Sequence, residues 1–199
     1  MKVSKLLVFG FSLLLLCTFC APHARASEWN QATKMTFSGP VQIPGKVLTA
    51  GTYWFTLLAN DSDRNIVQVW NADRMHLLAT FLAVPDYREH AKGRTVVKFE
   101  EEHPRGMPEA LEVWFYPGDN YGHEFVYPET EARDLAKRVG HPVLSMRDDV
   151  ASNITKPAKS ANDSSVVALK HATVQAVNPQ GQDVNMAKAA QTSPQGAKQ

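Results

Sequence analysis

Short apolar runs separated by turn signals occupy the chain from Thr33 to Tyr127. Alternation of apolar and polar residues within a run is the period of a half-buried strand. Seven strands are predicted: Thr33–Phe37, Thr52–Ala59, Ile66–Asn71, Leu77–Val84, Arg94–Glu100, Ala110–Tyr116 and His123–Tyr127. The fourth is apolar on both faces, which predicts a central strand. Together they predict a mainly β fold, an antiparallel sandwich of immunoglobulin-like or transthyretin-like size.

A helix is predicted after the last strand, near residues 129–139. Its apolar residues recur at i, i+3, i+4 and i+7 and form one stripe: Ala132, Leu135, Ala136 and Val139. Pro128 suits the first turn of a helix, and Gly140 suits its end. The stripe needs an apolar surface to pack on, and the sandwich is the expected one.

The distribution of aromatic residues sets the predicted domain boundary. After the first 26 residues, every Phe, Trp and Tyr lies between Trp29 and Tyr127. We therefore assign 27–148 to the sandwich domain and 149–199 to a low-complexity tail. Such a composition buries too little apolar surface to offset its ordering entropy, so the tail is predicted to be mostly disordered. Within it, Ser165–Val177 is a candidate for a short docked strand.

Residues 1–26 are predicted to be a cleaved signal peptide. Lys2 and Lys5 precede the apolar stretch Leu6–Phe19, and Ala24-Arg25-Ala26 is a small-x-small cleavage site. The alternative is a retained membrane anchor, but a stretch of 14 residues is short for a bilayer core, which needs about 20. The protein is therefore predicted to be secreted, either periplasmic or extracellular, with no membrane span after cleavage.

Charge and cysteine content narrow the possible functions. Three of the 21 basic residues and none of the 20 acidic ones lie in the signal peptide, so the remaining chain has 18 basic and 20 acidic residues. A near-neutral chain without a basic run argues against nucleic-acid binding. Both cysteines, Cys17 and Cys20, also lie in the signal peptide. Disulfides and cysteine chemistry are thus not expected after cleavage.

Motifs for metal binding and catalysis are weak. No two histidines have metal-ligand spacing, and the calcium-loop-like run from Asp61 to Asn65 lacks the glycine and glutamate that an EF-hand needs. The sequence therefore predicts no metal and no cofactor. There is no Gly-x-Ser-x-Gly motif either. A carboxylate pair remains possible, with Glu112 beside Trp114 as one member, or with His123 near the carboxylates.

The tryptophans are the most informative candidate site. Because side chains alternate along a strand, Trp54, Trp70 and Trp114 each stand on the more polar side of a predicted strand. With Glu112 they form a candidate aromatic platform for a sugar ring or a partner. The alternative is that the helix stripe covers them, because large apolar patches are seldom left bare on monomers.

Two segments resemble known secreted bacterial proteins. The stretch from Pro44 to Tyr53, with its Ala-Gly-x-Tyr motif, is similar to several secreted β-sandwich families of unknown function. The motif Tyr121-Gly-His-Glu-Phe-Val-Tyr-Pro128, with the helix that follows, resembles one uncharacterised secreted bacterial family over residues 29–146. The resemblance implies a β-sandwich and export, and it implies no activity.

These observations favour an exported, non-enzymatic protein: an envelope-associated module that binds a ligand or partner, such as an envelope polysaccharide or protein. Two alternatives stay open. One is a secreted hydrolase that uses carboxylates and His123. The other is a passive scaffold tethered by its tail. A hydrolase requires the carboxylates and His123 to converge in a cleft, whereas a binding module requires adjacent, exposed tryptophans.

Overall fold

The computed structural model describes residues 31–60, 64–100 and 106–185. The predicted signal peptide 1–26, Trp29 and the turn at Asp61–Asp63 lie outside the described residues. The protein is mainly β, with a few helices and more than one sheet.

The larger sheet has nine strands. They are β1 (Ala32–Phe37), β2 (Val41–Ile43), β3 (Lys46–Leu48), β4 (Gly51–Asn60), β5 (Asn65–Asn71), β6 (Leu77–Tyr87), β7 (Val96–Phe99), β8 (Glu109–Phe115) and β9 (Tyr121–Phe125). Their order is β1-β4-β5-β6-β9-β8-β2-β3, with β7 beside β8, and all pairs are antiparallel except β2 and β8.

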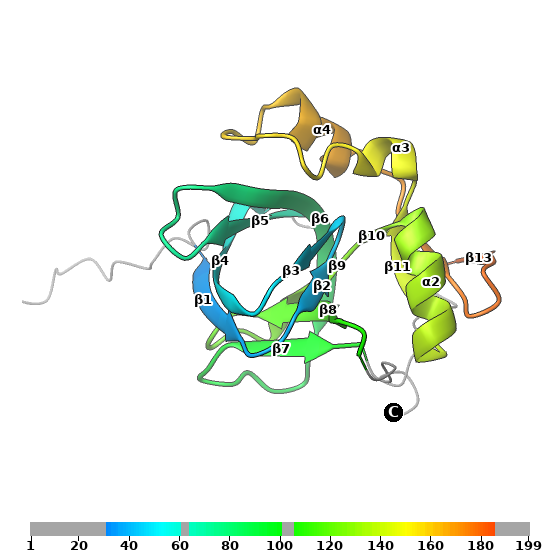
Figure 1. Cartoon of the computed structure of the whole chain (residues 1–199), viewed down its shortest axis with the longest axis horizontal. Helices are drawn as coiled ribbons and strands as arrows, with labels where there is room; N and C mark the ends of the chain where they lie inside the picture. Colours follow the sequence, from blue (N-terminus) through cyan, green and yellow to red (C-terminus); the bar gives the residue numbers. More distant parts are fainter. Residues whose placement is uncertain (1–30, 61–63, 101–105, 186–199) are drawn as a thin grey trace, which may run out of the picture.

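All seven predicted strands are present within a few residues of their expected bounds, and β6 is central, as predicted. The β2–β3 hairpin was not predicted, because its three-residue strands are too short to show a period. The sheet curls round on itself, as Figure 1 shows, and brings its two ends together. There the rings of Phe37 on β1 and Phe99 on β7 lie 6.4 Å apart.

A smaller sheet of four short strands follows. It consists of β10 (Tyr127–Pro128), β11 (Val143–Met146), β12 (Gln175–Val177) and β13 (Asp183–Val184), in that order. Tyr127 connects it to the larger sheet, because its buried hydroxyl donates to the carbonyl oxygen of Leu111 at 2.6 Å.

The predicted helix is present as α2 (Glu129–Val139). Its four stripe residues are buried, and Gly140 ends it in the left-handed conformation with φ 73°. Its packing differs from the expectation. The helix packs against β10, β11 and β12 of the smaller sheet, and Figure 1 shows it beside β11. It does not cover the tryptophan-bearing strands, so the expected roof over the tryptophans is wrong in this respect.

The interpretation of 149–199 as a mostly disordered tail is wrong for residues 149–185. This part contains α3 (Asp148–Ala151), α4 (Ser164–Lys170), β12 and β13. The candidate docked strand Ser165–Val177 divides into α4 and β12. Six apolar residues of 149–185 are almost completely buried in the common core: Ile154, Ala158, Val166, Leu169, Ala176 and Val177. The existing sheets supply the apolar surface that this segment cannot supply alone.

Candidate functional site

The structure brings together two of the three candidate tryptophans. Trp54 on β4 is the direct cross-strand neighbour of Trp70 on β5, and both are partly exposed. Trp114 on β8 is instead fully buried in the core, where its ring centre lies 6.2 Å from that of Phe55 and 5.2 Å from that of His123. Trp114 therefore does not share a surface with the other two.

Hydrogen bonds and cations fix the Trp54–Trp70 pair. The indole N–H of Trp54 donates to the carbonyl oxygen of Ala72, and that of Trp70 donates to the Thr56 hydroxyl, both at 3.2 Å. Lys34 and Arg74 lie 5.9 and 5.1 Å from the centre of the Trp54 ring. These are cation–π distances, so the Trp54 ring already has partners within the chain.

A cleft of about 270 Å³ adjoins Trp70. One wall comes from the β5–β6 hairpin and the other from the segment between α3 and α4. The lining residues are Trp70, Met75, His76, Leu77, Leu78, Ala79, Ile154, Thr155, Lys156, Pro157, Ala158 and Lys159. Most are apolar, and Met75 at the rim is 75% exposed.

The second wall is pinned to the sheet at two points. The backbone N–H of Thr80 donates to the carbonyl oxygen of Ile154 at 2.9 Å. The side-chain amide of Gln68, on the neighbouring strand, donates to the carbonyl oxygen of Ala158 at 2.8 Å. Ile154 and Ala158 are also buried. The cleft is therefore built by the fold itself, since its two walls are joined by backbone and side-chain hydrogen bonds.

Glu112 lies in a second region, a group of partly buried carboxyls on β8 and β9. Burial raises the pKa of Glu112 to about 7, and the neighbouring charge of Glu100 adds to this effect. Burial likewise raises the pKa of Glu124 to about 8, with Glu112 and Asp86 adding to it. The ammonium of Lys98 acts in the opposite direction and lies 3.5 Å from the Asp86 carboxylate. At neutral pH this region can hold protons on carboxyl groups.

His141 lies at the border of the same group. Its Nε2 is 3.0 Å from a carboxylate oxygen of Glu100, and both side chains are nearly buried. Burial alone lowers the pKa of His141, but the hydrogen bond and charge of Glu100 outweigh it and raise the pKa to about 9. The imidazole of His141 is therefore protonated and positively charged at pH 7.

His123 belongs to the interior and does not meet these carboxyls. It is fully buried, and burial lowers its pKa to about 4, so the imidazole is neutral at pH 7. The Gln31 amide N–H donates to Asp119 at 2.7 Å, which leaves the Gln31 oxygen to accept from His123 Nε2 at 3.2 Å. Glu124, the next residue, points to the opposite face of β9 because side chains alternate.

Sequence reasoning did not find the cleft wall at Ile154–Lys159, nor Glu124 and Glu100 as neighbours of Glu112. The wall carries no motif, and the carboxyls come from three different strands or strand ends.

Within the described ranges, no group of three or more His, Cys, Asp or Glu side chains has the geometry to hold a metal ion. None of the described helices is long and apolar enough to cross a membrane. Comparisons with protein-family models, with curated proteins and with solved structures find no match.

Proposed function

We propose that this protein is an exported, non-enzymatic binding module and that the cleft beside Trp70 is its binding site. The observation that carries the proposal is the combination of the partly exposed Trp70 on one wall with a second wall held to the sheet at Ile154 and Ala158. Binding sites are concave, mostly apolar and largely preformed, and this cleft has those properties.

The sequence supports the proposed location. The basic start, the apolar stretch and the Ala24-Arg25-Ala26 site are typical of a signal peptide, which gives a periplasmic or extracellular protein of the bacterial envelope. A kinship with immunoglobulin-like or transthyretin-like sandwiches, and with the uncharacterised secreted family, is part of the same proposal. Its support is the mainly β fold and the two quoted motifs.

Tryptophan fluorescence of residues 27–199 with acrylamide quenching tests the proposal. Four single variants, Trp29→Phe, Trp54→Phe, Trp70→Phe and Trp114→Phe, assign the signals of the four tryptophans. We expect acrylamide to quench Trp54 and Trp70 and to leave Trp114 unquenched. Titration with envelope polysaccharide fragments and with small organic ligands is expected to shift the emission of Trp70. A chain in which no ligand changes the Trp70 signal contradicts the proposal.

The carboxyl group of β8 and β9 favours a second candidate, a carboxylate-dependent hydrolase. Glu112 and Glu124, with pKa values raised to about 7 and 8, have the protonation expected of a general acid at neutral pH. Turnover of 4-nitrophenyl glycosides by the parent chain, with loss of turnover in Glu112→Gln and Glu124→Gln, would favour the hydrolase over the binding module.

A further inference from the structure

The charge of the cleft beside Trp70 narrows the class of ligand. We infer that the cleft binds a small organic anion, with a flat or acyl apolar body against Trp70 and an anionic group beside Lys156 and Lys159. This inference rests on the binding function proposed above and names its ligand class.

The size and lining of the cleft indicate a small apolar body. Its volume of about 270 Å³ lies near the lower end of ligand pockets, which span roughly 300–1,000 Å³. Leu77, Leu78 and Pro157 contribute apolar surface to the cleft that the Trp70 ring lines. The Trp70 indole N–H is held by Thr56, so the ring is fixed at the wall and loses little freedom when a ligand packs on it.

The ionisable lining is basic. It includes Lys156, Lys159 and His76 and no carboxylate. The Lys156 ammonium donates to the neutral side-chain oxygen of Asn153 at 2.7 Å. In the described part of the chain neither lysine forms a salt bridge. Both cations are thus available to an anionic ligand.

The nearby acids are already engaged with backbone. A carboxylate oxygen of Asp163 accepts from the backbone N–H groups of Lys159 and Ser160, at 2.6 and 3.0 Å. Asp73, in the β5–β6 turn, accepts from the backbone N–H of Met75 at 2.8 Å. These acids stabilise the two loops that build the walls. The charged side chains that line the cleft itself are the two lysines, so an anion is preferred there over a cation of the same shape.

Two dyes with the same aromatic body test the inference. 8-Anilinonaphthalene-1-sulfonate carries a sulfonate, and N-phenyl-1-naphthylamine lacks it. Fluorescence titration of residues 27–199 is expected to show one site, with the sulfonate dye bound about ten-fold more tightly. The double variant Lys156→Gln/Lys159→Gln is expected to bind that dye about five- to ten-fold more weakly, which corresponds to about 1–1.4 kcal/mol, because it removes both cations. Its affinity for the neutral dye is expected to stay the same.

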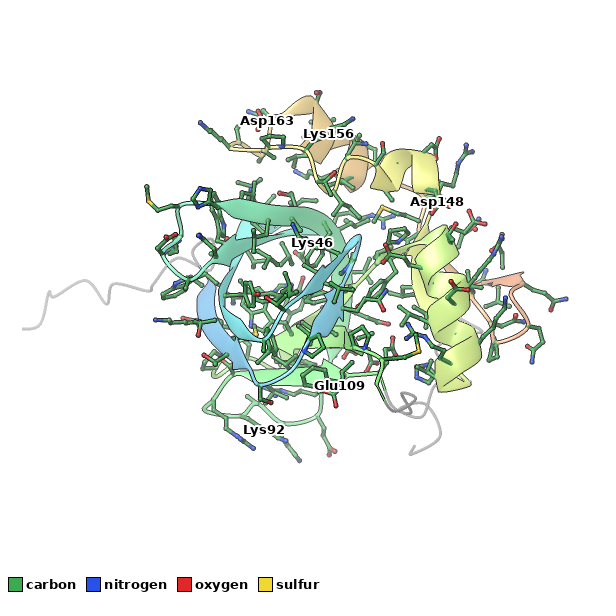
Figure 2. The ribbon with its side chains drawn as sticks, in the orientation of Figure 1. Lys46, Lys92, Glu109, Asp148, Lys156 and Asp163 are labelled. Atoms are coloured by element: carbon green, nitrogen blue, oxygen red, sulfur yellow. The ribbon has the colours of Figure 1, made fainter. Side chains whose placement is uncertain are left out.

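Matched controls separate charge from folding. Lys92→Gln/Arg94→Gln removes two exposed cations between β6 and β7, and Figure 2 shows Lys92 on the opposite side of the molecule from Lys156. This variant is expected to bind both dyes like the parent. Trp70→Ala is expected to weaken both dyes, with near-ultraviolet circular dichroism confirming that it is folded. The Lys156→Gln/Lys159→Gln variant changes exposed positions and is expected to fold. It therefore still tests the ligand class if Trp70→Ala does not fold.

Three outcomes overturn the inference. Equal affinity for both dyes, still dependent on Trp70, contradicts the anionic ligand class and leaves the binding function standing. Unchanged affinity of the sulfonate dye in the Lys156/Lys159 double variant also contradicts the ligand class. Absence of binding, or binding that Trp70→Ala does not weaken, contradicts both the ligand class and the proposed site.

Discussion

The interior of the larger sheet and its outer face both use tryptophan, with different consequences. Inside, Trp114 packs between Phe55 and His123 and has no exposed surface. Outside, Trp54 and Trp70 lie side by side, partly exposed, next to cations and a cleft. The same side chain fills the core in one place and is partly exposed at the proposed binding surface in the other. The comparison predicts that substitutions on the two faces separate stability from binding.

The largest expected effect distinguishes the two kinds of tryptophan directly. Trp114→Ala removes a fully buried side chain and is expected to lower the free energy of unfolding by about 3–5 kcal/mol, because it leaves a cavity. Trp70→Ala removes a partly exposed one and is expected to cost roughly 1–2 kcal/mol. Urea denaturation followed by far-ultraviolet circular dichroism measures both. Equal losses would contradict the division into core and surface.

The next effect concerns the outer face where β8 and β9 meet. A Cβ atom on Gly122 would lie 2.5 Å from the ring of Phe115, which is fully buried and has the Arg88 guanidinium 4.4 Å from its centre. Gly122→Ala is therefore expected to destabilise the protein by about 3 kcal/mol through overpacking.

Two further variants test this explanation by thermal unfolding. Adding Phe115→Leu to Gly122→Ala is expected to recover part of the loss, because the smaller side chain removes the clash. Gly93→Ala is the matched control, since nothing lies within 4 Å of a Cβ atom there. A Gly122→Ala protein as stable as the Gly93→Ala control would show that the ring moves aside without cost.

The division into inner and outer faces was only partly predictable from the sequence. Strands with clear turn residues at both ends were predicted correctly, as was α2 with its acidic first turn and Gly140. The side of β8 that faces the core was predicted wrongly. Regular alternation puts Leu111 and Trp114 on opposite faces, yet both belong to the same core cluster. The register shift at Lys98–Phe99, opposite this part of β8, allows this, and a single strand's pattern does not reveal a bulge.

The prediction that the segment after Ala151 is disordered was wrong for a different reason. Amino-acid composition indicates only whether a segment can bury enough apolar surface by itself. Here Ile154, Val166 and Leu169 pack against sheets that other parts of the chain have already built. Few apolar residues are sufficient when each becomes completely buried. One wall of the cleft comes from this segment. Because the segment was predicted to be disordered, the cleft could not be predicted either.

The pH dependence of stability also distinguishes the two faces of the larger sheet, beginning with Glu124. The folded pKa of Glu124, about 8, lies above its ordinary value of 4.5, so the folded protein holds a proton that the unfolded chain releases between those pH values. The free energy of unfolding therefore falls as pH rises across this range. Glu124→Gln removes this loss and is expected to stabilise the protein at pH 9 by several kcal/mol, since each unit of pKa difference corresponds to about 1.4 kcal/mol, with little effect at pH 4.

His123 supplies the opposite dependence from the interior. Its pKa is lowered to about 4, so the unfolded chain binds a proton between about pH 4 and 6.5 that the folded protein does not, and stability rises with pH there. Urea denaturation at pH 5, 7 and 9 distinguishes the two contributions. Glu89→Gln, at an exposed carboxyl, is the control for Glu124→Gln. Parallel stability curves for the parent and Glu124→Gln would show that Glu124 is not protonated in the folded protein.

The smallest expected effect lies at Trp54, where the outer face meets solvent. The Arg74 guanidinium lies 5.1 Å from the ring centre, and a cation–π contact at an exposed site contributes about 0.5–1 kcal/mol. Arg74→Gln is expected to cost that much and to increase acrylamide quenching of Trp54, because the ring loses its cover. In a Trp54→Phe background the cost should shrink, since phenylalanine attracts a cation less strongly. An Arg74→Gln cost that is the same in both backgrounds would assign the effect to the turn backbone, where Arg74 has a φ of 61°.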